Sequence, residues 1–332
     1  MNLQQRIDLL ARLGKYLISG DAGWAAAKTK ASAENAWFIP EFVELAANHI
    51  ALEWLEKDKL EKWVAPYGLP EENRNPKTIG LVMAGNIPLV GFHDFLSVFI
   101  SGNRQRIKPS SKDNILLRQL VGQLSGWDPE VEDLVVFSDR LKGCNAYIAT
   151  GSNNSSRYFD YYFNSYPHII RRNRTSAAIL DGRESPAALE KLADDVFLYF
   201  GLGCRNITKL YLPPGYDFVP LLKSFDKYAF LKENHKYRNN YDYQLALFIL
   251  NKQYYMTNQA LLLSENKAIF SPIAVLHYEY YEEAESVLKE LKDNPDIQCL
   301  VGLENIPFGE VQRPGLTDYA DGIDTLQFLL DN

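Results

Sequence analysis

Short apolar runs alternate with helical segments from Thr78 to Val301, and this alternation constrains the fold more than any other feature of the sequence. In the first half, five runs predict β-strands, at residues 78–83, 105–108, 133–136, 146–149 and 176–180. The intervening residues with helical spacing are 89–100, 113–124 and 155–163. Strands joined through helices form parallel sheets that helices cover on both faces. We therefore expect an α/β protein with doubly wound, largely parallel sheets.

A second block with the same alternation follows Asp181-Gly182. Its expected strands are 207–212, 273–277 and 298–301, and its expected helices are 185–199, 219–231, 243–250 and 282–291. Two helices, 3–19 and 40–63, precede the first block, and the tail 322–330 has the pattern of one more strand. With about 150 residues to a domain, 332 residues suit two domains. We expect the parts 1–181, 182–308 and 309–332, the last carrying a strand added to another sheet or another subunit.

Charge and cysteine content exclude several classes of protein. The chain has 35 Lys and Arg against 42 Asp and Glu, a net charge of −7, whereas nucleic-acid binders derive their affinity from clustered cations. Three widely spaced cysteines without a C-x-x-C pair argue against a disulfide framework or a Cys-based zinc site. Charges interrupt the N-terminal apolar stretch, and no apolar run reaches about 18 residues. We expect a cytoplasmic protein with no membrane span, no metal and no nucleic-acid partner.

Polar residues gather where the predicted strands end, which is where open parallel sheets bind ligands. Residues 83–88 (MAGNIP) follow the first strand, and Asn86 there offers two amide donors at a helix N-terminus. Gly151 and Ser152 follow another strand and lead into the helix at 155–163. An ordinary Asn cap followed by a proline at the first helical position explains residues 83–88 as well. Residue types alone leave both interpretations open.

A cation with two hydroxyls follows the second strand. Residues 107–111 (IKPSS) place Lys108 near Ser110 and Ser111 just before a helix, a composition that suits a ribose or a phosphate at the helix N-terminus. A capped helix and a solvated lysine explain the same pattern. Neither G-x-G-x-x-G nor G-x-x-x-x-G-K-[ST] occurs, so neither familiar phosphate-binding loop is present.

Residues 200–206 (FGLGCRN) lie between a predicted helix and a predicted strand and contain a candidate nucleophile. The glycines before Cys204 make the backbone there tight and accessible, and Arg205 beside it would favour the thiolate, which is the nucleophilic form. An inert cysteine fits the same pattern. Cys144 and Cys299 have the surroundings of small buried apolar residues. No histidine has the local signature of a Cys–His hydrolase, and G-x-S-x-G is absent.

Taken in chain order, these segments resemble the aldehyde dehydrogenase superfamily, and within it the LuxC-like acyl-CoA reductases, the fatty-acid reductase component of bacterial bioluminescence and its relatives. The resemblance extends from residue 78 to residue 330. Six segments carry it: AGNIPL at 84–89, IKPSS at 107–111, ATGS at 149–152, GLGC at 201–204, AIFSPI at 268–273 and PFGEVQRPGLTDYADGIDTL at 307–326. It implies an aldehyde-dehydrogenase-like fold of two doubly wound α/β domains.

The resemblance also implies a role for each segment. Cys204 would be the nucleophile, and Asn86 would form part of the oxyanion hole. The cofactor-binding residues would be Lys108, Ser110, Ser111, Gly151, Ser152 and Phe270. Residues 1–181 would include the dinucleotide-binding domain, 182–308 would form the catalytic domain, and 309–332 would be a C-terminal segment that takes part in oligomerisation.

Three departures from the superfamily pattern bear on the reaction. Hydrolytic members carry a general-base Glu in an E-L-G-G-K-like stretch, whereas the corresponding residues 170–175 (IRRNRT) contain no carboxylate. A Glu that holds the nicotinamide ribose corresponds to Ala268, and the glycine-rich turn between the Lys and Gly-Ser segments is absent. Without a base to activate water, an acyl-enzyme survives long enough for a hydride or a thiol to reach it.

The expected function is therefore reduction of an acyl-CoA, with a fatty acyl group, to an aldehyde through an acyl-enzyme on Cys204. NADPH is the expected cofactor, with NADH as the alternative, because the cationic, hydroxyl-rich segment around Lys108 suits a 2′-phosphate. Two other functions remain open: a Cys-dependent acyl transferase or esterase that uses no nicotinamide, and a non-catalytic partner subunit of a reductase complex. The expected assembly is a homo-oligomer or such a complex.

Overall fold

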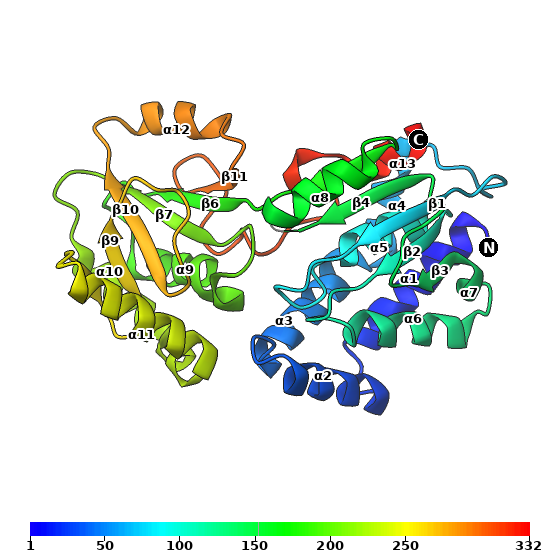
Figure 1. Ribbon diagram of the computed structural model, residues 1–332, viewed down its shortest axis with the longest axis horizontal. Coiled ribbons are helices and arrows are strands. Elements are labelled where there is room, and N and C mark those ends of the chain that lie inside the picture. Colours follow the sequence, from blue (N-terminus) through cyan, green and yellow to red (C-terminus); the bar gives the residue numbers. More distant parts are fainter. Residues whose placement is uncertain (152) are drawn as a thin grey trace. The chain divides into compact units, whose positions relative to one another are not determined.

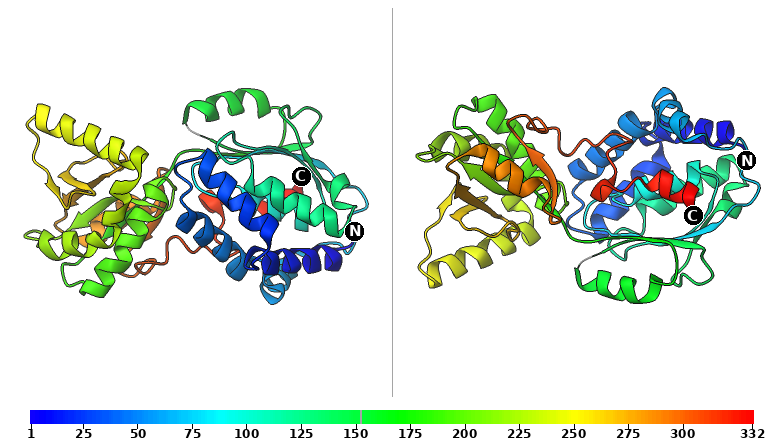
Figure 2. Two further views of the ribbon diagram at one scale, coloured as in Figure 1. Left: turned by 90° about the horizontal axis from the view of Figure 1, so that it is seen from below. Right: turned by 90° about the horizontal axis from the view of Figure 1, so that it is seen from above.

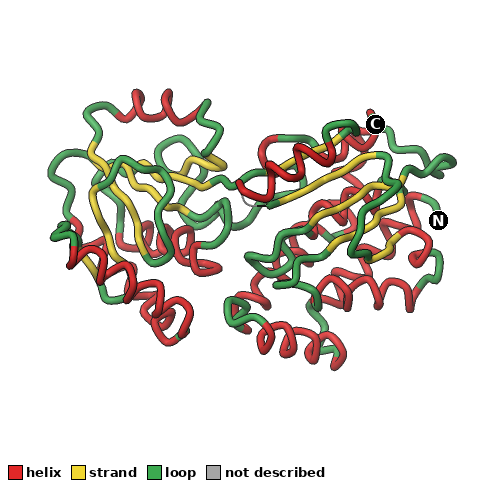
Figure 3. Tube along the Cα trace, viewed as in Figure 1, coloured by secondary structure: helices red, strands yellow, loops and turns green. Residues whose placement is uncertain are grey.

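The computed structural model describes residues 1–151 and 153–332, and the chain forms two compact units (Figure 1). Unit 1 comprises residues 1–173 and 314–332, and unit 2 comprises residues 174–313. Each unit combines one β-sheet with several helices (Figure 3). Across residues 1–151 and 153–332, no helix is both long enough and apolar enough to cross a membrane.

The sheet of unit 1 has five strands, and every pairing between them is parallel. In chain order the strands are β1 (Thr78–Val82), β2 (Arg104–Lys108), β3 (Val135–Phe137), β4 (Ala146–Thr150) and β5 (His168–Arg171). Their order across the sheet is β3-β2-β1-β4-β5. The chain leaves β1 toward β2 and returns to β4 on the other side, so the order reverses between β1 and β4. This arrangement is the doubly wound pattern of nucleotide-binding folds.

Helices cover both faces of this sheet. Helix α5 (Phe92–Ile100) is largely apolar and almost entirely buried, and it contacts β1, β2 and helix α1. Figure 2 shows α8 (Asn153–Phe163) on one face of the sheet and the N-terminal helices with α6 on the other. The remaining helices of this unit are α1 (Leu3–Leu17), α2 (Ala22–Glu34), α3 (Pro40–His49), a π-helix (Ile50–Trp54), α4 (Lys57–Val64), a 3₁₀ turn (Ala65–Tyr67), α6 (Leu116–Trp127) and α7 (Val131–Leu134).

The C-terminal tail is a helix of unit 1, so the strand expected at 322–330 is wrong. Helix α13 (Thr325–Asp331) follows a 3₁₀ turn (Ala320–Gly322) and packs against α5. The side chain of Asp324 caps α13 by accepting a hydrogen bond from the backbone N–H of Gln327 at 2.9 Å. Buried Leu326 and Leu329 lie one turn apart on the face toward the core. Because the tail completes the core of unit 1, it adds no strand to another subunit.

A buried ion pair holds the tail in place. The guanidinium of Arg171, at the end of β5, pairs with Asp94 in the first turn of α5, and both side chains are nearly inaccessible to solvent. Its Nη2 donates a hydrogen bond to Oγ1 of Thr325 at 2.8 Å. Removing one partner of such a pair leaves a buried charge uncompensated, which is strongly destabilising. Arg171 therefore joins a strand, a helix and the C-terminal segment of this unit.

The sheet of unit 2 has six strands in the order β11-β6-β7-β10-β9-β8. All its pairings are parallel except that of the short edge strand β8 with β9. The strands are β6 (Thr175–Ile179), β7 (Ile207–Leu212), β8 (Met256–Thr257), β9 (Leu262–Glu265), β10 (Val275–Tyr280) and β11 (Ile297–Val301). The α-helices are α9 (Pro186–Phe197), α10 (Phe218–Phe225), α11 (His235–Leu250) and α12 (Ala284–Lys292), with 3₁₀ segments Leu198–Gly201 and Asp226–Glu233. Figure 1 shows α12 on one face and α9, α10 and α11 on the other.

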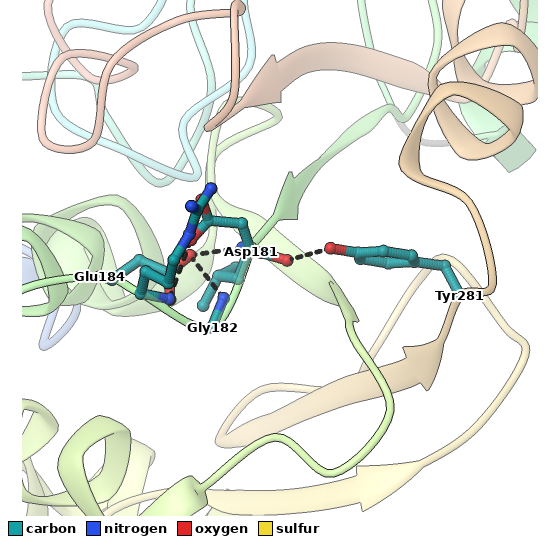
Figure 4. Close-up of polar contacts among 6 residues, drawn as sticks. Asp181, Gly182, Glu184 and Tyr281 are labelled. Atoms are coloured by element: carbon teal, nitrogen blue, oxygen red, sulfur yellow. Dashed lines mark hydrogen bonds and ion pairs between the residues drawn. The ribbon is translucent and has the colours of Figure 1, made fainter.

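The division between the units lies at residues 173 and 174, whereas the sequence placed it at Asp181-Gly182. Strand β6 precedes Asp181 and is hydrogen-bonded to β7 and β11, so it belongs to the sheet of unit 2. Asp181 begins a tight turn: Oε1 of Glu184 accepts hydrogen bonds from its N–H at 2.6 Å and from that of Gly182 at 3.4 Å (Figure 4). The hydroxyl of Tyr281 donates to the carbonyl of Leu180 at 2.8 Å.

Both sheets are largely parallel, and helices cover both faces of each. The expected fold class is therefore confirmed.

Candidate active site

Three of the predicted polar segments leave unit 1's sheet at one edge. The register pairs Val82 at the end of β1 with Lys108 on β2 and with Ala149 on β4. The segments that contain Asn86, Lys108 and Gly151 therefore follow neighbouring strand ends. This edge includes the reversal of strand order between β1 and β4, which is where doubly wound sheets bind ligands. Ser152, the remaining predicted cofactor residue of this unit, lies outside the described residues.

The loop that contains Asn86 packs directly on the loop after β2. A Cβ added to Gly85 would lie 2.5 Å from Oγ of Ser110 and 3.1 Å from the backbone nitrogen of Asp113, so only glycine fits there. Oδ2 of Asp113 accepts a hydrogen bond at 2.8 Å from the N–H of Leu89, whose φ of 56° is left-handed. Burial raises the pKa of Asp113 to about 6. Asn86 lies between Gly85 and Leu89, and its side chain is half-buried.

The hydroxyls and the lysine after β2 have different environments. Oγ of Ser110 accepts a hydrogen bond from the N–H of Lys112 at 3.2 Å, which is the contact of an ordinary serine turn. Lys108 and Ser111 are exposed to solvent at the strand end. Lys108 is thus the residue of this segment that is best placed to meet a ligand above the edge of the sheet.

In unit 2, Cys204 lies on a backbone with unusual conformations. The loop joins α9 to β7, and Tyr199, Phe200 and Gly201 have φ values of 55°, 58° and 71°. A left-handed residue other than glycine costs about 1–3 kcal/mol and persists only where its surroundings enforce it. Both aromatic residues are buried, and the ring of Phe200 lies 5.6 Å from that of Tyr237. Packing therefore maintains a strained turn immediately before the candidate nucleophile, as is common at functional sites.

Asn206 fixes the other side of this loop. Its side chain is fully buried, and its Oδ1 accepts a hydrogen bond from the N–H of Gly203 at 2.8 Å. Its Nδ2 donates to the carbonyls of Leu198 at 2.9 Å and Asp195 at 3.1 Å, at the C-terminal end of α9. Oγ of Ser176 on β6 donates to the carbonyl of Cys204 at 3.1 Å. The sequence did not reveal the role of Asn206, because its partners are backbone groups that only the folded loop brings to it.

Cys204 is the most accessible of the three cysteines. Its side chain is half-buried, whereas Cys144 and Cys299 are 3% and 7% exposed. Burial raises the pKa of the Cys144 thiol. The guanidinium of Arg205, expected beside the nucleophile, donates to Sγ of Cys299 on β11 at 3.4 Å. A nucleophilic role is therefore sterically open to Cys204 and closed to the other two thiols.

The segment with Phe270 lies in the same unit as Cys204 and contacts β7, the strand that follows the Cys204 loop. It forms the loop between β9 and β10, where Ala268 is exposed and Phe270 is half-buried. Oγ1 of Thr208, near the start of β7, donates a hydrogen bond to the carbonyl of Ile269 at 2.7 Å. The loop of the predicted nicotinamide contact is thus bonded to β7, the strand that follows the loop of the predicted nucleophile. Across the described ranges, no group of three His, Cys, Asp or Glu side chains is arranged to hold a metal ion.

Comparison with known proteins relates this architecture to solved structures. The sequence matches no protein-family model and no curated protein. Aldehyde dehydrogenase 21 from Physcomitrella patens superposes with a TM-score of 0.66 at 14% identity, covering 92% of this chain and 74% of that one. The aldehyde dehydrogenase KauB from Pseudomonas aeruginosa gives 0.62 at 12%, covering 91% and 72%. Indole-3-acetaldehyde dehydrogenase from P. syringae, in complex with NAD⁺, gives 0.61 at 11%, covering 89% and 70%. The chain has the fold of the aldehyde dehydrogenases.

Proposed function

We propose that this protein is a nicotinamide-dependent oxidoreductase of aldehyde chemistry, and specifically an NADPH-dependent acyl-CoA reductase that converts a fatty acyl thioester to an aldehyde. The observation that carries the proposal is Cys204: a half-buried cysteine shortly after a strained turn, with its backbone fixed by Asn206 and Ser176, in an aldehyde-dehydrogenase fold. A fixed backbone with a solvent-reachable sulfur is what covalent catalysis by cysteine requires.

In this mechanism the Cys204 thiolate attacks the thioester carbonyl. The carbon–sulfur bond to CoA breaks, CoA leaves as the thiol, and the acyl group remains on Cys204. We assign the developing oxyanion to the backbone N–H of Cys204, since such donors act where negative charge forms in the transition state. A bound nicotinamide cofactor supplies the hydride for the reduction. Breakdown of the resulting thiohemiacetal releases the aldehyde and regenerates Cys204.

The segment that the resemblance aligns with the general-base stretch of hydrolytic members favours reduction over hydrolysis. The stretch 170–175, which corresponds to the general-base segment, contains three arginines and no carboxylate. Arg171 is buried against Asp94, and Arg172 pairs with Asp160 on α8 at 3.0 Å. Hydrolysis of an acyl-enzyme needs a positioned base to activate water. The stretch 170–175 itself supplies no carboxylate, which supports an acyl-enzyme that persists until hydride reaches it.

The residues available to hold the cofactor fit a dinucleotide. Lys108, Ser111 and the Gly151 segment follow neighbouring strand ends in the sheet of unit 1, which supports the proposal because doubly wound sheets bind nucleotides beyond such strand ends. NADPH is proposed over NADH because Lys108 is an exposed cation at this edge, and a cation accommodates the 2′-phosphate. Phe270 in unit 2 is the proposed contact near the nicotinamide ribose.

Replacing Lys108 by alanine is expected to weaken NADPH binding by about tenfold and to leave NADH binding within about twofold. Only NADPH carries the 2′-phosphate, which would lose the charge of Lys108 in the variant. Dissociation constants from calorimetry measure this directly. Lys142→Ala removes an exposed lysine of the loop between β3 and β4 in the same unit and serves as the matched control. Equal weakening of both cofactors by the Lys108 variant would contradict the assignment.

The function is tested by mixing the wild-type protein with NADPH and acyl-CoA of several chain lengths. Oxidation of NADPH that depends on acyl-CoA, with aldehyde as product, is the expected result. CoA release without NADPH consumption would instead indicate an acyl transferase or esterase. Neither reaction with any chain length, together with no acyl adduct on Cys204, would indicate a non-catalytic subunit and overturn the proposal.

A further inference from the structure

Lys209 is a fully buried lysine on β7, five residues after Cys204. Its side chain has no solvent exposure. Lysine is almost never buried this completely unless its ammonium has dedicated partners, because losing hydration disfavours the charged form. Burial accordingly lowers the pKa of Lys209. The reaction proposed above gives this residue no role.

The partners of Lys209 lead to the loop that contains Phe270. Nζ donates one hydrogen bond to the backbone carbonyl of Asn266 in that loop. Nζ also forms an ion pair with Oε2 of Glu279 on β10 at 3.0 Å, and the Glu279 side chain is 32% exposed to solvent. Lys209 is aligned with His277 in the pairing of β7 with β10, so both side chains lie on one face of the sheet.

Three side chains of the sheet hold three carbonyls of this loop. Besides Lys209 on the carbonyl of Asn266, Nδ1 of His277 donates to the carbonyl of Ala268 at 3.0 Å, and Thr208 holds that of Ile269. The loop from 266 to 274 contains no helix or strand, and backbone hydrogen bonds to β10 and β9 hold mainly its ends, Asn266 and Ala274. Side-chain contacts are therefore important for the conformation of the residues between them. Side chains of β7 and β10 thus donate hydrogen bonds to three carbonyls of one short loop.

We propose that Lys209 is a positioning residue. It fixes residues 266–271 of this loop, including Phe270, relative to β7 and to the Cys204 loop that leads into β7. The proposal rests on the proposed function. An apolar side chain would satisfy this buried sheet position at least as well for stability. The ammonium adds a directed bond to a loop carbonyl, and Glu279 neutralises its charge. Loss of that bond therefore frees the loop and impairs cofactor binding, while acylation of Cys204 continues.

The test compares Lys209→Met with Thr208→Val, which removes a second support with little change of shape, and with Lys289→Met, which removes an exposed lysine of α12 as control. Both support variants are expected to raise KM for NADPH, by about tenfold for Lys209→Met, while kcat and the rate of Cys204 alkylation by iodoacetamide stay within about twofold. Amide hydrogen exchange at 267–271 is expected to quicken by about tenfold, without change in β7 or β10.

Each outcome decides the proposal. Unchanged KM and unchanged exchange at 267–271 in both support variants would overturn it, and so would faster exchange across the whole of unit 2, which indicates general destabilisation. If Lys209→Met does not fold, Thr208→Val decides alone by the same measurements. If the wild-type protein oxidises no NADPH, the proposed function has failed, and hydrogen exchange still tests whether Lys209 holds the loop.

Discussion

Replacing Cys204 by alanine is expected to lower acyl-CoA reduction by about 10⁴-fold or more, the scale of loss seen when the nucleophile of a covalent mechanism is removed. The thiolate forms the bond that retains the acyl group, and neither of the other two cysteines can substitute, because both are buried. The strained turn at Tyr199 and Phe200 remains in the variant, since packing rather than the thiol maintains it.

The measurement pairs steady-state NADPH oxidation with mass spectrometry of the protein after exposure to acyl-CoA alone. The wild type is expected to gain one acyl group on the peptide that contains Cys204, and the alanine variant none. Cys144→Ala removes a buried thiol of unit 1 and is expected to behave as wild type. Full activity in the Cys204 variant, or an acyl group on a different residue, would refute the assignment of the nucleophile.

Replacing Asp195 by asparagine is expected to remove about 4 kcal/mol of pH dependence from the free energy of unfolding. Asp195 is fully buried on α9, and Oδ2 accepts a hydrogen bond from the N–H of Gly309 at 2.7 Å. Its Oδ1 has no hydrogen-bond partner in the described part of the chain. Burial raises the pKa of this carboxyl from 3.8 to about 7.

The sign follows from which state binds the proton. Between pH 4 and pH 7 the unfolded chain has largely lost the proton of Asp195 while the folded chain retains it. The free energy of unfolding therefore falls as pH rises through this window, and the contribution of the carboxyl is fully present only below its unfolded pKa. Asparagine keeps an oxygen acceptor for Gly309 but cannot ionise, so the variant lacks this loss.

Urea unfolding at pH 4 to pH 8 measures the effect. The wild type is expected to lose more stability than Asp195→Asn as pH rises, and the gap is expected to close toward pH 4. Asp293→Asn, at an exposed position after α12, is the control and should retain the wild-type slope. Parallel stability curves for wild type and Asp195→Asn would show that the carboxyl does not titrate in this range.

Local pattern was sufficient for most of the strands. The apolar runs that became β1, β4 and β7 are bounded by turn-forming residues, and the structure places all three within a residue or two of the expected limits. The strands β5, β8 and β9 were not predicted. β5 ends in Arg171, which is unfavourable in a buried strand until Asp94 supplies its counter-charge from 77 positions away along the chain.

The C-terminal tail shows the limit of periodicity. A short apolar run fits a strand or a buried helix turn equally well, and length alone favoured neither at residues 322–330. Packing against α5, which lies far away along the chain, decided for a helix, and the local cap of Asp324 on the N–H of Gln327 begins it.

The sequence by itself determined the α/β class, the two blocks of alternating strands and helices, and the polar segments at strand ends, because these depend on neighbours along the chain. Only the tertiary structure decided which polar side chains are buried and which backbone groups they bond. Asn206, Asp195 and Lys209 look unremarkable in the sequence, yet each is buried and bonded to a backbone distant in sequence or on another element. A buried polar group must find partners, and the fold determines which backbone groups lie within reach.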